Sequence, residues 1–254
     1  MVPGGVLKNV SEWSESDASD EITYSLHIDS LYISKYELTQ KGYRQIMDTI
    51  TDEQMTYEVW DPQKKFVEKG DSLPVQLLLR EAMDYCNKRS KLEGYDGFYK
   101  FSGDTVMIDV NGNGYRLPHH MEWLYAARGG NLSNGYKYSG SNRLKEVAWY
   151  AGNSGLKPHK IGQLRSNELG LYDMTGNSRE FNGTSGDFGY WHTPMFTNDA
   201  YFNYNLPLKK VLDKDYWKDY GEWRNGVRLV LIPKNIINKN LLLKSKKKQS
   251  SEYW

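Results

Sequence analysis

The chain has 254 residues, and its 33 basic and 32 acidic side chains leave a net charge of +1. This balance gives no reason to expect binding to nucleic acid or to an anionic membrane, and no apolar run has membrane-spanning length. The single cysteine, Cys86, excludes a disulfide framework within the chain. The length suits one large domain, and an aromatic content of 14% can build a core from large flat side chains.

The first fifty residues predict a loop, short strands and a helix. Residues 9–21 are acidic and rich in serine, which is typical of a surface loop. Apolar side chains alternate in part over residues 22–34, and this pattern predicts one or two strands. Thr39 is a suitable N-cap, and apolar residues recur after it at helical spacing as far as Ile50. We therefore expect an amphipathic helix directly after Thr39.

The next segment is irregular until a second helix begins. Residues 51–72 are polar and show no period, whereas apolar residues from Leu78 onward mark a helix that ends near Gly94. Cys86 falls on the inward face of this helix, so we expect a buried and unreactive thiol. Residues 94–109 carry aromatic side chains and predict a hairpin.

The sequence DVNGNG at residues 109–114 allows two interpretations. It matches the opening of a calcium-binding loop, but His120 stands where an EF-hand requires a bidentate glutamate. Asn-Gly is also an ordinary hairpin turn, and we favour the turn. Pro118 then suits the first turn of a helix, which the glycines at 129 and 130 end.

The last third of the chain is rich in aromatic residues and poor in regular pattern. Residues 182–223 interleave rings with glycines, and residues 223–231 predict a closing strand. Residues 233–254 form a basic tail whose lysines offer contacts to acidic lipid or nucleic acid. A solvated, frayed terminus also explains this tail, and we favour that interpretation.

Two long motifs carry a family resemblance. The chain reads YRLP-x3-EW-x-YAARGG over residues 115–130 and N-x2-GLYDM-x-GN-x2-EF over residues 167–181. These motifs resemble the sulfatase-modifying-factor family, whose formylglycine-generating-enzyme domain has a fold related to C-type lectins. Shorter matches are VPGG at residues 2–5, YISKYELT at 32–39, LPV and DYCNKRS between 73 and 90, and NGVRLVL at 225–231. The resemblance covers residues 1–232 and predicts a compact, loop-rich α+β domain with two main helices and short, mostly antiparallel sheets.

The resemblance does not carry the family's chemistry with it. Active members oxidise a cysteine of a client sulfatase with a cysteine pair that binds copper, a soft ion suited to thiolates. This chain has no cysteine after Cys86, which matches a helix cysteine of the family, so we expect neither copper nor the oxidase activity. A sister branch binds iron through three histidines, but the histidines here do not form its pattern and we expect no iron. They are His27, His119, His120, His159 and His192.

A structural calcium is the metal that the resemblance does imply. Family members hold it with residues that match the side chains of Asp173 and Glu180 and the carbonyl groups of Gly176 and Ser178. Two carboxylates and a glycine turn that exposes carbonyls form a reasonable set of hard oxygen ligands. The alternative is that both carboxylates only cap the turn through backbone N–H groups. A second calcium site of the family needs a longer acidic loop than residues 154–160 provide, so we expect it to be lost.

The aromatic region is the remaining candidate surface. In the lectin-like fold, that end of the domain commonly faces ligands, and exposed rings suit stacking on sugars or gripping a peptide. Most of these rings are expected to pack inward. Tyr190, Trp191 and Trp223 are the candidates for exposure and for ligand binding.

We therefore expect a non-catalytic binding module for a protein, peptide or glycan, placed at a bacterial cell envelope. The export signal is expected to be absent from this chain, and a periplasmic, surface or lipoprotein location stays open. One alternative is a metal-dependent oxidoreductase of the same family with altered chemistry. The other is a structural subunit of an envelope assembly, which the basic tail would help to anchor.

Overall fold

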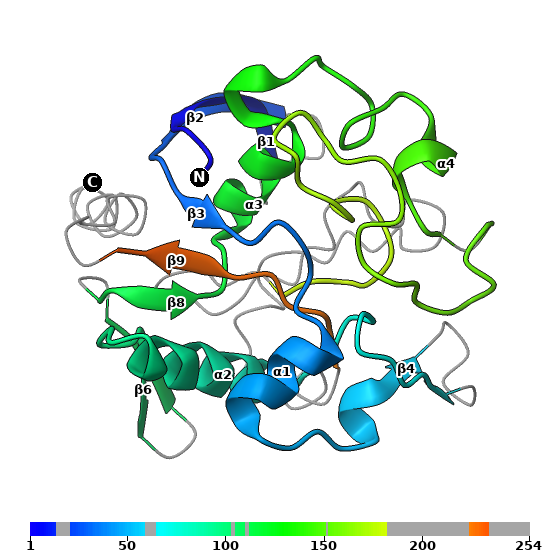
Figure 1. Cartoon of the computed structure of the whole chain (residues 1–254). Helices are drawn as coiled ribbons and strands as arrows, with labels where there is room; N and C mark the ends of the chain where they lie inside the picture. Colours follow the sequence, from blue (N-terminus) through cyan, green and yellow to red (C-terminus); the bar gives the residue numbers. More distant parts are fainter. Residues whose placement is uncertain are drawn as a thin grey trace.

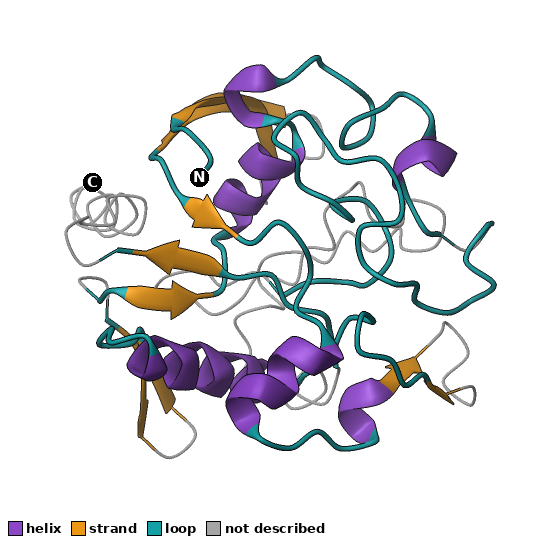
Figure 2. Cartoon of the chain, viewed as in Figure 1, coloured by secondary structure: helices purple, strands orange, loops and turns teal. Residues whose placement is uncertain are grey.

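The computed structural model describes residues 1–13, 21–58, 65–102, 105–109, 112–150, 152–181 and 224–233. Its helices and short antiparallel strands are joined by long loops, as Figure 2 shows, and the predicted α+β class is confirmed. Within the described residues, no helix combines the length and the apolar character that crossing a bilayer requires.

A three-stranded antiparallel sheet joins the two ends of the described chain. Its order is β3 (Tyr32–Ile33), β9 (Val230–Ile232) and β8 (Gly114–Arg116), so the late strand β9 lies between two early ones (Figure 1). The sequence predicts a closing strand over residues 223–231, but the regular strand is only Val230–Ile232. The residues before it form isolated β-bridges to other loops, such as the bridge between Asn225 and Leu77.

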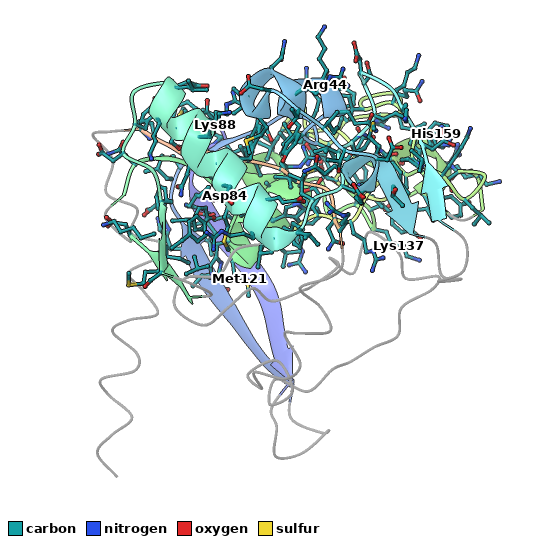
Figure 3. All side chains as sticks on the ribbon, turned by 90° about the horizontal axis from the view of Figure 1, so that it is seen from below. Arg44, Asp84, Lys88, Met121, Lys137 and His159 are labelled. Carbon is teal, nitrogen blue, oxygen red and sulfur yellow. The ribbon has the colours of Figure 1, made fainter. Side chains whose placement is uncertain are left out.

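The hairpin of β1 (Gly5–Trp13) and β2 (Glu21–Ile28) corrects the expectation of a surface loop over residues 9–21. Residues 9–13 belong to β1, which pairs antiparallel with β2, and the register shifts between Leu7 and Val10. The base of the hairpin is anchored in the core, since Leu7 and Ile28 are buried. Its far part projects from the body (Figure 3).

Both amphipathic helices are confirmed. Helix α1 (Gln40–Met47) begins after Thr39, whose hydroxyl accepts a hydrogen bond from the Gly42 N–H at 3.0 Å. Helix α2 (Leu79–Leu92) packs beside α1, and the rings of Tyr43 and Tyr85 stack with centroids 5.6 Å apart. Ile50 lies beyond the end of α1, so that helix is shorter than its apolar spacing predicts.

Two small hairpins flank these helices. Strand β4 (Thr56–Glu58), which follows the 3-10 turn η1 (Glu53–Met55), pairs with β5 (Lys65–Val67), so residues 51–72 are more regular than predicted. The predicted hairpin within residues 94–109 is present as β6 (Tyr99–Ser102) and β7 (Thr105–Ile108).

Helix α3 (His120–Ala127) contributes several residues to the core, among them Trp123, which is fully buried. Its N-cap is His119, whose Nδ1 accepts a hydrogen bond from the Met121 N–H at 3.1 Å. Pro118 therefore precedes the N-cap. The prediction from the sequence that it lies in the first turn of the helix is wrong. The other helical segments within the described residues are η2 (Gly130–Leu132) and α4 (Leu144–Val147).

Two contacts of Asp109 bear on the turn that the sequence predicts after it. The Gly112 N–H donates to the Asp109 carbonyl at 2.8 Å, and the Asp109 carboxylate pairs with Lys100 at 2.8 Å. These contacts favour the turn over a calcium loop at this position.

Candidate functional site: a buried carboxylate cluster and the loop it supports

The turn that carries the predicted calcium ligands has three residues in the left-handed region. Asp173 has φ of 56°, Gly176 of 81° and Asn177 of 63°. Asp and Asn tolerate this conformation better than most residues. A Cβ on Gly176 would lie 2.2 Å from the Trp149 carbonyl oxygen, so only glycine fits there. The Asn177 N–H donates to the same carbonyl at 2.9 Å, which fixes the turn against the segment around Trp149.

Four buried charged side chains meet behind this turn. We call Glu37, Asp173 and Glu180, together with Arg228, the carboxylate cluster. Arg228 donates from Nη2 to Glu180 Oε1 at 2.8 Å and from Nε to both Glu180 oxygens at 3.1 Å. This fork-like pairing is the strong geometry for a guanidinium and a carboxylate.

The fold supplies further hydrogen-bond partners to this pair. The other N–H groups of Arg228 donate to the Ser34 carbonyl at 3.0 Å and to the Tyr172 carbonyl at 2.8 Å. Trp123 on α3 donates its indole N–H to Glu180 Oε2 at 2.6 Å. Arg228 therefore joins segments that are far apart in the sequence.

The other two carboxylates of the cluster bind backbone and amide N–H groups. Glu37 accepts from the Asn177 side chain at 2.6 Å and from the Ser178 N–H at 3.0 Å. Asp173 accepts from the Gly162 N–H at 2.6 Å. Through these bonds the cluster holds both the turn and the loop that contains Gly162.

The cluster carries more negative than positive charge. Burial raises the pKa of Glu37 well above its ordinary value, and the neighbouring charges of Asp173 and Glu180 raise it further. Burial also raises the pKa of Asp173. Three carboxylates facing one guanidinium disfavour full ionisation, so protonation or an additional cation is favourable at this place.

The carboxylates among the predicted calcium ligands have hydrogen-bond partners within the protein. Both oxygens of Glu180 are bound by Arg228 and one also by Trp123, and Asp173 is bound by the Gly162 N–H. Within the described ranges, no group of three or more His, Cys, Asp or Glu side chains is arranged to hold a metal ion. Of the two carboxylates, Asp173 accepts a backbone N–H, from Gly162, whereas Glu180 accepts from the side chains of Arg228 and Trp123.

The other candidate residues are dispersed or lie elsewhere. Tyr190, Trp191 and Trp223 fall outside the described residues. His119 caps α3, whereas His159 lies in the loop that follows residue 156.

Cys86 is fully buried on α2, and burial raises the pKa of its thiol above the ordinary range. The expectation of a buried thiol is confirmed. Because the thiolate is the reactive form, these conditions make this sulfur a poor nucleophile and a poor metal ligand.

The sequence interpretation missed Glu37, Arg228 and Trp123 as parts of this site. All three lie in segments that carry the family resemblance: YISKYELT, NGVRLVL and the EW pair. A buried charge in an otherwise apolar strand such as NGVRLVL is the signal that could have found Arg228, because such a charge needs a partner.

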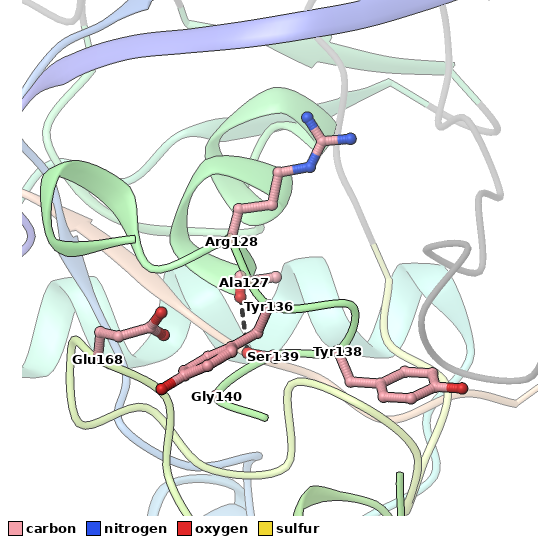
Figure 4. Close-up of a pocket in the computed structure, with 7 residues that line it drawn as sticks. All are labelled: Ala127, Arg128, Tyr136, Tyr138, Ser139, Gly140 and Glu168. Atoms are coloured by element: carbon pink, nitrogen blue, oxygen red, sulfur yellow. Dashed lines mark hydrogen bonds between the residues drawn. The ribbon is translucent and has the colours of Figure 1, made fainter. Parts of the chain in front are cut away.

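Two hollows are lined by residues that the structure describes. The smaller, of about 10 Å³, is bounded by Tyr136, Arg128 and Glu168, and Figure 4 shows the Arg128 guanidinium pointing away from Glu168. It has room for about one water molecule, beside a Glu168 oxygen that has no hydrogen-bond partner among the described residues. The larger is an open groove of about 490 Å³ between residues 68–73 and residues 157–163.

The fold and the cluster define a loop-rich domain of the formylglycine-generating-enzyme type, and comparison with known proteins agrees. The family model described as "Sulfatase-modifying factor enzyme 1-like domain" matches residues 1–193. The chain therefore belongs to this family. It is also 36% identical over 214 residues to "Chaperone protein LppX" of Paenibacillus barcinonensis, a match that covers 71% of this chain and 69% of that protein.

Solved structures show the same fold. Treponema denticola variable protein 1 superposes with a TM-score of 0.58 at 23% identity, over 91% of this chain and 95% of its own. CarF superposes with a TM-score of 0.56 at 24% identity, over 72% of this chain and 78% of its own. PvdO from Pseudomonas aeruginosa superposes with a TM-score of 0.53 at 16% identity, over 91% of this chain and 92% of its own. At these identities the similarity shows the fold alone.

Proposed function

We propose that this chain is a non-catalytic member of the family that binds polypeptides as a chaperone, outside the cytoplasm of a bacterium. The observation that carries the proposal is the state of its one cysteine. Cys86 is buried, its thiol pKa is raised by burial, and no second cysteine exists in the chain to form a copper-binding pair.

The ligand class is inferred from a relative. The protein from Paenibacillus barcinonensis that is 36% identical to this chain is named a chaperone. A chaperone binds other polypeptides, which favours a protein or peptide ligand over a glycan. The aromatic residues Tyr190, Trp191 and Trp223 stay our candidates for contacts with apolar parts of such a ligand.

A structural calcium is a separate part of the proposal. Asp173 and Glu180, with the carbonyl groups of Gly176 and Ser178, would hold it, and its charge would offset the excess of carboxylates in the cluster. The test is a thermal melt after exhaustive dialysis against EDTA, with calcium or magnesium added back. A calcium-specific rise in Tm is expected because a ligand that binds only the native state stabilises it. An unchanged Tm would leave Arg228 as the only cation of the cluster.

The function is tested with an aggregation assay. Heat-treated citrate synthase serves as the aggregating probe, with serum albumin at equal mass as a control for crowding. We expect suppression of light scattering that reaches its limit near a stoichiometric ratio, without nucleotide. Scattering equal to that of the albumin control would contradict the proposal.

The enzymatic alternative is tested on the same preparation. The protein is incubated with oxygen, added copper or iron, and a cysteine-containing sulfatase peptide. The mass of the peptide is then measured by mass spectrometry. We expect the peptide to stay unmodified. Catalytic turnover of the cysteine would favour the oxidoreductase.

A further inference from the structure

The larger hollow is a groove with two walls that are tied to each other. One wall is residues 68–73, and the other is residues 157–160 with Gln163. The Ile161 N–H donates to the Ser72 carbonyl at 3.0 Å, which joins the walls at one point. A volume of about 490 Å³ suits several residues of an extended chain better than a single ion. We call it the basic groove, for the reason given below.

His159 lines the basic groove with its ring held in one orientation. The ring stacks on Trp149 with centroids 3.7 Å apart and planes 12° from parallel. Its Nε2 lies 2.9 Å from the Ser154 carbonyl, which only accepts, so Nε2 carries the proton in the neutral ring. Nδ1 is then left as an acceptor. Figure 3 places His159 at the edge of the body, far from Met121.

The backbone of His159 is fixed by the turn of the carboxylate cluster. Its N–H donates to Asn177 Oδ1 at 2.8 Å, and its carbonyl accepts from Asn177 Nδ2 at 3.2 Å. Asn177 in turn donates to Glu37 at 2.6 Å. A ring that is fixed on both its backbone and its side chain loses little conformational entropy when a ligand binds.

Two acidic side chains, Glu68 and Asp71, line the groove together with three lysines. The Asp71 carboxylate is bound by Arg44, and the Lys69 ammonium is bound by Asp52 at 2.8 Å, outside the groove. Lys157 reaches Glu68 only at 3.9 Å.

Lys160 is exposed and makes no ion pair with any residue that the structure describes. The wall that contains His159 therefore presents two exposed ammonium groups to the groove, and the Lys157 ammonium lies 3.9 Å from a Glu68 oxygen. This is the reason for its name.

We propose that the basic groove binds an acidic segment of an extended polypeptide. The inference rests on the proposed polypeptide-binding function and names the part of a client that this face recognises. Lys157 and Lys160 pair with carboxylates of the segment, and His159 Nδ1 accepts a backbone N–H from it. A free phosphate or a nucleic acid offers the lysines similar charges but no such N–H.

The test uses fluorescein-labelled peptides of about twelve residues, a length that spans such a groove in extended form. One alternates Glu and Gly, one Gln and Gly, and one Lys and Gly, and binding is followed by anisotropy. We expect saturable binding of the Glu peptide alone, weakened by added salt. The double variant K157Q/K160Q should bind it about five- to tenfold more weakly, since each exposed ion pair contributes little on its own.

The matched control is K91Q/K145Q, which removes the same charge from two exposed lysines on α2 and α4. It should bind the Glu peptide as the parent protein does. Equal weakening in both double variants would show a general charge effect and overturn the inference. Displacement of the peptide by inorganic phosphate at lower concentration than by acetylated diglutamate would also overturn it.

The inference and the proposed function fail in different ways. If K157Q/K160Q leaves peptide binding unchanged while citrate synthase aggregation is still suppressed, the groove is wrong and the function stands. If the Glu peptide binds through the two lysines but aggregation is not suppressed, the groove stands and the chaperone function fails.

Discussion

Two buried arginine–glutamate pairs lie at the neighbouring strands β8 and β9, and they face very different amounts of negative charge. Arg116 on β8 pairs with Glu122 at 2.7 Å through both nitrogens of its fork. Arg228, just before β9, pairs with Glu180 but also faces Glu37 and Asp173 in the carboxylate cluster. The first pair is balanced, and the second is short of positive charge.

The two pairs also differ in what they hold. Glu122 accepts from the His119 N–H at 2.8 Å, so the Arg116 pair caps the start of α3, a local role. The Arg228 pair connects α3, through Trp123, with segments that are far apart in the sequence. The balanced pair, Arg116 with Glu122, caps one helix. The unbalanced carboxylate cluster supports the loop that lines the basic groove, through the bonds of Asn177 to Glu37 and to His159.

Replacement of either arginine should give the largest loss of stability, and the two losses should differ. We expect R116M to cost about 3 kcal/mol of unfolding free energy and R228M about 5 kcal/mol or more, because breaking a buried pair leaves carboxylates uncompensated. Urea unfolding followed by tryptophan fluorescence measures both. If R228M does not fold, R228K and R116K retain the charge and lose only the fork, and the same order is expected. An equal or reversed order would contradict the difference between the two sites.

A smaller loss is expected from W123F, which removes the indole N–H from Glu180. A hydrogen bond to a buried carboxylate contributes about 2 kcal/mol. The matched control is W149F, because the Trp149 Nε1 is buried and has no partner among the described residues. Urea midpoints should fall further for W123F than for W149F. A larger fall for W149F would show that the hydrogen bond from Trp123 to Glu180 does not stabilise the fold.

The two sites should respond to pH with opposite signs. Burial opposes ionisation of Glu122, but the Arg116 charge outweighs it and the pKa falls to about 2. Stability from Glu122 is therefore complete above its unfolded value of 4.5 and is lost as the pH falls toward 2. The pKa of Asp173 is raised above 3.8, so its contribution is present below pH 3.8 and is lost as the pH rises through the folded value.

The variant D173N tests this sign. Asn retains the acceptor for the Gly162 N–H and tolerates the left-handed backbone. In EDTA at pH 7 we expect D173N to equal or exceed the parent stability by up to about 1 kcal/mol, and to match it near pH 3. A clear loss at pH 7 without calcium would show that the Asp173 charge is stabilising and that the cluster is not short of positive charge.

A similarly small effect is expected at Cys86, which lies on the Arg116 side of the core. The variant C86A should cost about 1 kcal/mol, since it removes one small buried group. Polypeptide binding should be unchanged. A thiol reagent should label the parent protein only after unfolding, and rapid labelling of the native protein would contradict the buried, inert thiol on which the function is argued.

The elements with a strong period or a clear cap were predictable. Thr39 as an N-cap and the inward face of α2 followed from spacing and side-chain chemistry alone. The end of the first hairpin strand was missed, because residues 9–13 have the polar composition of a loop and their pairing with β2 is a tertiary effect. The strand β9 was predicted too long for a similar reason, since its neighbours in space decide where pairing stops.

The candidate site was predictable only in part. Asp173 and Glu180 were found through the motif, but their partners Glu37 and Arg228 are more than 130 and about 50 residues away in the chain. No local period links such positions. The same holds for the basic groove, whose walls are joined by a backbone hydrogen bond between Ile161 and Ser72 and by the ion pair of Lys157 with Glu68.

The account rests most directly on binding of an unfolded polypeptide. The probe is fluorescein-labelled α-lactalbumin that has been reduced and carboxymethylated, so that it stays unfolded. The protein, whose metal content has been determined, is titrated into this probe, and binding is measured by fluorescence anisotropy. Native α-lactalbumin carries the same label as a control. We predict saturable binding of the unfolded form only. No binding of either form, or equal binding of both, would contradict a chaperone function for this chain.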